Sequence, residues 1–132
     1  MAQDWPMWGG TPDRNMVGNA KNLPTDIVIG ETDGETEVVD MAGSKNLLWT
    51  AKLGSQSYGN TVVAGGKVFV GTNNEAPRDP KMGGDRGVLM CFDEKTGSFL
   101  WQLVIPKLGA GKVSDWEDVG LCSSPAVEDG RL

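Results

Sequence analysis

The chain has 132 residues, with 12 Lys and Arg against 18 Asp and Glu, a net charge of −6, and no His. The acidic balance without a basic cluster disfavours nucleic-acid binding, because neutralising phosphates requires grouped Lys and Arg. The lack of His excludes a Ser-His-Asp hydrolase and a His-ligated zinc site, and no apolar run reaches the roughly 20 residues needed to span a membrane.

Residues 1–46 are predicted to be an irregular segment that leads into the domain. Gly, Pro and Asp alternate with Trp over 4–13, which predicts turns around anchoring aromatic rings. Residues 27–29 and 37–39 can form short strands, and the acidic run 31–37 between them predicts an exposed loop. A calcium loop is the alternative for this run, but its spacing does not follow the D-x-[DN]-x-[DN]-G pattern. The N-terminus lacks the charged and apolar regions of a signal peptide.

From Leu47 onward, short β-type runs alternate with turn residues, which predicts an all-β region over 47–132. The predicted strands are 47–53, 60–64, 67–72, 87–93, 99–105 and 124–128, with another one beginning at Arg131. Gly65-Gly66 and residues 94–97 are predicted tight turns, because glycine accepts the positive φ of hairpin turns. No segment has a helical period.

The chain contains an internal repeat. Leu47-Leu48-Trp49 matches Phe99-Leu100-Trp101, 52 residues later, and 60–68 matches 124–132, 64 residues later. Units of about 40–50 residues with four short strands and one Trp are typical of β-propeller blades. The prediction is therefore a partial β-propeller, with one complete four-stranded antiparallel blade and part of a second. A small β-sandwich is the alternative, but it does not account for the repeated Trp strand and hairpin.

The segment from Cys91 to Trp101 has a mechanical interpretation. Asp93 can accept turn N–H groups, Gly97 permits a left-handed position, and Trp101 can reach an adjacent blade. The segment resembles the tryptophan-docking motif, A-x-D-x-x-T-G-x-x-x-W, of quinoprotein-type (PQQ-like) β-propellers. The matching positions are Asp93, Thr96, Gly97 and Trp101, with Cys91 in place of Ala, and Trp49 is the corresponding Trp of the preceding repeat.

The resemblance extends to the opening 4–10 and to 123–130, and the chain is similar to BamB-related PQQ-like repeat proteins, as an N-terminal fragment. It implies a periplasmic or extracellular, non-catalytic binding or scaffold module without a cofactor. A polar small molecule, a glycan, an envelope protein and the remaining blades of the same chain are the implied partners. The alternative is a PQQ-dependent dehydrogenase that oxidises an alcohol or sugar with PQQ and calcium. Those enzymes have two adjacent cysteines over the PQQ ring, whereas this chain has a single cysteine, Cys122, at the comparable place.

Strand direction predicts where a binding surface lies. Successive antiparallel strands place the long connections 54–59, 73–86 and 106–123 at one end and the tight turns 65–66, 94–98 and 129–130 at the other. Long loops on a rigid scaffold tend to carry binding residues. The alternative is that these loops only cover the end of the blade. The predicted polar surface, called the candidate ligand face, consists of Tyr58, Asn73, Asn74, Glu75, Arg78, Arg86, Asp115, Trp116, Glu117 and Asp118.

Overall fold

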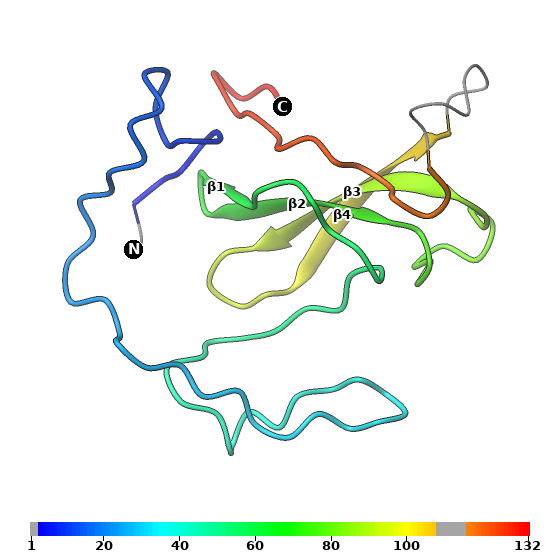
Figure 1. Ribbon diagram of the computed structural model, residues 1–132, viewed down its shortest axis with the longest axis horizontal. Coiled ribbons are helices and arrows are strands. Elements are labelled where there is room, and N and C mark those ends of the chain that lie inside the picture. Colours follow the sequence, from blue (N-terminus) through cyan, green and yellow to red (C-terminus); the bar gives the residue numbers. More distant parts are fainter. Residues whose placement is uncertain (1–2, 108–115) are drawn as a thin grey trace.

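The computed structural model describes residues 3–107 and 116–132. They form one open four-stranded antiparallel sheet with the order β1-β2-β3-β4 (Figure 1). The strands are β1 (Val62–Ala64), β2 (Lys67–Asn73), β3 (Arg86–Asp93) and β4 (Phe99–Pro106). The described residues contain no helix, so none that could cross a membrane. The all-β prediction is confirmed to this extent, and the sheet is consistent with a single blade-like unit.

The hairpins follow the predicted turn chemistry. Gly65 and Gly66 have φ values of 58° and 74° and connect β1 to β2, with Ala64 opposite Lys67. Both φ values are positive, as a two-residue hairpin turn requires. The β3–β4 pairing runs from Arg86 opposite Pro106 to Cys91 opposite Trp101, and a register shift follows before Phe92.

Several predicted strands are wrong. Residues 47–53 form no strand, and 124–128 form none either. The predicted hairpin near Arg131 is reduced to one bridge with Glu128, and 27–29 and 37–39 also contribute only single bridges. The physical reason is that a strand is defined by ladder pairing, and the described residues offer these segments no neighbouring strand to extend a ladder.

The sheet buries side chains on both sides. The N-terminal face, so named because 47–53 covers it, presents the core residues Val68, Val70, Val88, Met90 and Phe92. The C-terminal face presents Val62, Ala64, Phe69, Leu89 and Cys91, and Leu121 and Val127 pack against it. Figure 1 shows 47–53 and the C-terminal segment on opposite sides of the sheet. Each face is thus contacted by a segment that contributes no strand, and the C-terminal face is covered only in part.

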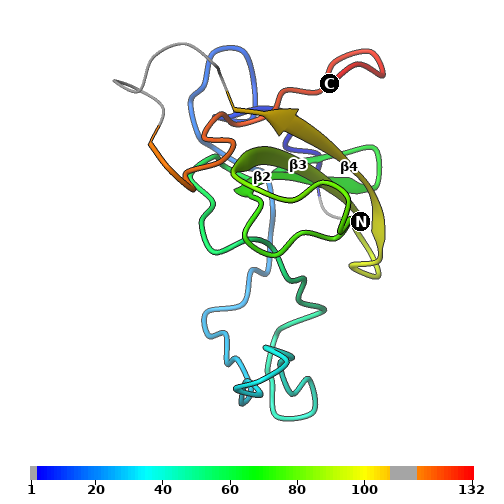
Figure 2. The same ribbon diagram turned by 90° about the vertical axis from the view of Figure 1, so that its right-hand side faces the viewer.

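The N-terminal segment touches the sheet at one place. The backbone N–H of Trp5 donates to the Val63 carbonyl at 2.7 Å, and the Val63 N–H donates back at 3.1 Å. The Pro6 carbonyl accepts the Val127 N–H at 2.7 Å. Residues 27–45 form a separate hairpin away from the sheet (Figure 2).

Candidate functional site

The turn between β3 and β4 is held by the Asp93 carboxylate. Its Oδ1 atom accepts the backbone N–H of Lys95 at 3.1 Å, the N–H of Thr96 at 2.9 Å and the Thr96 hydroxyl at 2.8 Å. These bonds lower the pKa of the Asp93 carboxyl, the Thr96 hydroxyl bond most of all, because they favour the charged form. The Gly97 N–H closes the turn on the Asp93 carbonyl at 2.9 Å, with Gly97 at φ 70°.

Trp49 docks onto this turn. Its indole Nε1–H donates to the Glu94 carbonyl at 2.9 Å, and its ring centroid lies 6.3 Å from that of Phe92. The indole covers Gly97 so closely that a Cβ atom there would lie 2.5 Å from Cδ2 of Trp49. The turn therefore needs glycine for two reasons, its positive φ and the space that the indole fills. The Trp of one repeat contacts the turn of the next.

Trp101 has a different environment. It lies on the C-terminal face of β4, where it is 39% exposed and its ring centroid is 6.0 Å from that of Phe69. Leu103 and Ile105 follow it on the same face and are 53% and 36% exposed. We call Trp101, Leu103 and Ile105 the β4 stripe.

The β4 stripe has a docked counterpart in the same chain. Moving 52 residues toward the N-terminus from Trp101, Leu103 and Ile105 gives Trp49, Ala51 and Leu53. These three side chains are the ones of segment 47–53 that pack against the N-terminal face of the sheet. The sequence prediction included both Trp residues but missed the other four. The signal that finds them is the apolar residue at every second position after each Trp.

The long connections meet around Asn73 at the other end of the sheet. The Asn73 side chain is 1% exposed; its Oδ1 accepts the Ser55 N–H at 3.0 Å. Its Nδ2 donates to the Asp118 carbonyl at 2.6 Å and to the Ser55 hydroxyl at 3.0 Å. Thr72 is also buried, and its hydroxyl bonds to Gln56 and Gly54. Asn73 therefore joins the loops 54–59 and 116–123 and is not presented to a ligand.

Other members of the candidate ligand face also contact the protein itself. The Asn74 amide donates to the Met82 and Gly84 carbonyls at 2.6 and 2.9 Å, which closes the loop 74–85 on itself. The Arg78 guanidinium does not lie with the other members. It is 4.5 Å from the ring centroid of Phe99 and donates to the Lys52 carbonyl at 2.7 Å. Arg86 donates to the Gly83 carbonyl at 2.9 Å.

The exposed part of the candidate ligand face is smaller than predicted. Tyr58 and Trp116 are 63% and 75% exposed. Glu75 and Glu117 are also exposed, and Glu117 follows Trp116 in the sequence. Asp118 is half-buried, and Asp115 lies outside the described residues.

An ion pair supports this end of the sheet. Lys107 pairs with Asp85 and also donates to the Trp116 carbonyl at 2.9 Å. The bonds from Lys107 and from the Asp118 N–H lower the pKa of the Asp85 carboxyl. The pair thus fixes the backbone at Trp116 relative to the start of β3.

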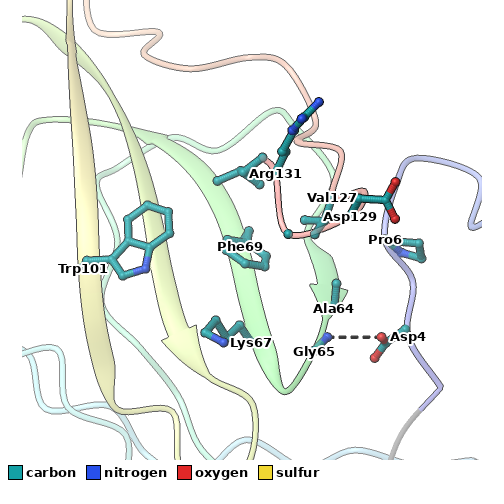
Figure 3. A pocket seen from close by; sticks show the side chains of 12 residues that line it. Asp4, Pro6, Ala64, Gly65, Lys67, Phe69, Trp101, Val127, Asp129 and Arg131 are labelled. Carbon is teal, nitrogen blue, oxygen red and sulfur yellow. Dashed lines mark hydrogen bonds between the residues drawn. The ribbon is translucent and has the colours of Figure 1, made fainter.

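A cleft of about 490 Å³ opens beside Trp101. Figure 3 shows Trp101 from β4 and Phe69 from β2 among its lining residues, with Lys67 below Phe69 in this view and Arg131 above it. Asp4 lies at the rim, where its carboxylate accepts the Gly65 N–H at 3.1 Å. The cleft adjoins the β4 stripe at Trp101.

The described residues do not fit PQQ or its calcium ion. Cys122 is exposed and Cys91 is buried on the C-terminal face, and both are free thiols, so the vicinal pair implied by the dehydrogenase alternative is absent from the chain. Within 3–107 and 116–132, no three carboxylates or thiols are grouped as metal ligands. Comparison of the chain with protein-family models, with curated proteins and with solved structures finds no match.

Proposed function

We propose that this chain is an arc of a PQQ-like, BamB-related β-propeller and that it serves as a non-catalytic binding or scaffold module in the periplasm or outside the cell. The observation that carries the proposal is the pair of matched stripes. Trp49, Ala51 and Leu53 cover the N-terminal face of the sheet, and the β4 stripe repeats them at a fixed spacing on a solvent-exposed surface.

The β4 stripe then has a defined partner, the N-terminal face of a following blade. Stacking the C-terminal side of one sheet on the N-terminal side of the next repeats the contact that 47–53 already makes. Repeat proteins bury their faces in this way, against neighbours rather than within one unit. The cleft beside Trp101 is the space that the following blade's equivalent of the turn 93–98 would occupy. The proposed partner is therefore the remaining blades of the same chain.

Self-association of the 132-residue chain tests the stripe. We expect concentration-dependent association in sedimentation velocity, because an exposed apolar stripe on an edge strand promotes pairing between molecules. Leu103→Lys should suppress association, whereas Gln102→Lys, a matched change on the opposite face of the same strand, should suppress it much less. A monodisperse wild-type monomer, or equal effects of the two lysines, contradicts the proposal.

The proposed recognition surface is the exposed part of the candidate ligand face, at Tyr58 and Trp116. Exposed aromatic rings on loops that also carry acidic residues suit a polar ligand such as a glycan, because rings stack on sugar faces while polar groups fix orientation. The probe is an array of immobilised neutral and acidic oligosaccharides. Tyr58→Ala and Trp116→Ala should reduce binding at least tenfold, and Leu48→Ala, at an 85% exposed position outside this surface, should not. Equal binding by all four proteins, or no binding by wild type, refutes a glycan-recognising surface.

A further inference from the structure

The hairpin 31–40 contains a second turn with the hydrogen bonds of the turn 93–98, onto which Trp49 docks. The Asp33 Oδ1 atom accepts the N–H of Glu35 at 3.0 Å, the N–H of Thr36 at 2.7 Å and the Thr36 hydroxyl at 2.8 Å. The Glu37 N–H donates to the Asp33 carbonyl and the Asp33 N–H to the Val38 carbonyl, both at 2.9 Å. The Val38 N–H donates to the Thr36 hydroxyl at 3.4 Å.

All six bonds recur 60 residues later. The turn at 93–98 has the same donors and acceptors at the corresponding positions, with distances of 2.8–3.2 Å. The flanking pairs correspond as well, since Thr32 bridges Val39 and Phe92 pairs with Phe99. In both turns the hydrogen bonds lower the pKa of the aspartate. The acidic run 31–37, predicted to be only an exposed loop, therefore has the backbone of an indole-docking turn. The shared Asp-x-x-Thr spacing is the sequence signal that finds it.

One position differs in a way that matters for docking. Glu37 occupies the place of Gly97 and has the same left-handed conformation, φ 59° against 70°. At Gly97 a Cβ atom would lie 2.5–2.7 Å from three atoms of the Trp49 indole. Glu37 carries that Cβ atom. The carbonyl equivalent to the indole acceptor Glu94 belongs to Gly34, an exposed residue. The acceptor residue therefore lies at the surface, whereas the Cβ atom of Glu37 obstructs the position of the ring.

We propose that the turn 33–38 is an indole-docking turn that Glu37 closes, so that of these two turns only 93–98 accepts a tryptophan. The Cβ atom of Glu37 fills the space of the indole. Its carboxylate is held by Lys52 at 2.7 Å, three residues after Trp49 in the sequence. Glu37 thus prevents a tryptophan of this or another repeat from docking on the wrong turn. The inference depends on the Trp49 contact in this structure and not on the proposed function.

The test compares three variants of the full chain with wild type. Glu37→Gly removes the obstruction and suits the positive φ, whereas Glu37→Ala removes the carboxylate and the ion pair but keeps the Cβ atom. Trp49→Ala empties the turn 93–98 and is the positive control. The probe is N-acetyltryptophanamide, followed through the backbone amide signals of both turns in ¹⁵N–¹H NMR spectra.

We expect saturable changes in amide chemical shift at 34–38 in Glu37→Gly and at 94–98 in Trp49→Ala. The dissociation constants should be on the order of 10 mM, as for one small ring on an open surface. Binding at 34–38 should be at least tenfold weaker in wild type and in Glu37→Ala. Equal binding by the Gly and Ala variants, or binding by wild type, overturns the proposal. If the probe binds neither Glu37→Gly nor Trp49→Ala, the proposal also fails, because the bare turn would then have no affinity for an indole.

Discussion

Replacing Gly97 by alanine tests how much the docked indole contributes to stability. The substitution has two separable costs. The first is the left-handed backbone at φ 70°, which costs an alanine about 1 kcal/mol. The second is the new Cβ atom, which would lie 2.5 Å from Cδ2 of Trp49 and must displace the ring.

A displaced indole loses two interactions. Its hydrogen bond to the Glu94 carbonyl contributes about 1 kcal/mol. Its contact with the Phe92 ring contributes about 1 kcal/mol more, as aromatic pairs do beyond their buried area. With the backbone cost, Gly97→Ala should lower the free energy of unfolding by about 3 kcal/mol.

Gly65→Ala is the matched control. Gly65 also has a positive φ, 58°, but a Cβ atom there would meet nothing within 4 Å. Only the backbone cost applies, about 1 kcal/mol. Urea unfolding of both variants by circular dichroism gives the comparison, provided that the slopes agree. Equal destabilisation of the two variants would show that the docked indole adds nothing to stability and would refute the reasoning.

Three further predictions concern the loops, the turn and the thiols. Asn73→Ala should lower the free energy of unfolding, measured in urea, by about 2–3 kcal/mol, because the buried amide loses its bonds to Ser55 and to the Asp118 carbonyl. It should also speed hydrogen exchange at Ser55. The pKa of Asp93 is lowered in the folded state, so its stabilisation is present above the unfolded pKa of about 3.9 and is lost as the pH falls through the folded pKa. Asp93→Asn should therefore flatten the fall of the urea midpoint below about pH 4; an unchanged acid dependence contradicts this. Cys122 should react with a thiol reagent in the native protein, whereas Cys91, which is buried and has its pKa raised by burial, should react only after unfolding.

The strands that could be predicted from sequence are those with local signals at both ends. The β1–β2 hairpin follows from Gly65-Gly66, and β3 and β4 follow from apolar runs on either side of the Asp93–Gly97 turn. The sequence predicts a strand at 47–53 because the segment is a short β-type run bounded by turn residues. The side chains that contact the sheet, Trp49, Ala51 and Leu53, also lie at every second position. Alternation of this kind is the same for a ladder strand and for an extended segment lying on a sheet face, so the pattern could not separate the two.

The candidate ligand face shows what sequence could not supply. Its residues were predicted to lie on long loops, but Asn73 ends β2 and Arg86 begins β3. Whether a polar side chain faces solvent depends, in addition, on how distant loops meet. Asn73 is buried because 54–59 and 116–123 converge on it. Arg78 crosses to Phe99 because its loop folds over the sheet. Both outcomes depend on contacts between segments 18 to 45 residues apart, which spacing alone does not reveal.

The six-bond turn has a consequence for the order of folding. Every one of its hydrogen bonds joins residues at most five apart in sequence, and contacts of such short range form on the microsecond timescale of hairpins. The turn can therefore exist in the chain before any sheet does, and it brings the start of β4 beside the end of β3. The indole of Trp49 bonds to a residue 45 positions away, so we expect it to dock after this turn has formed.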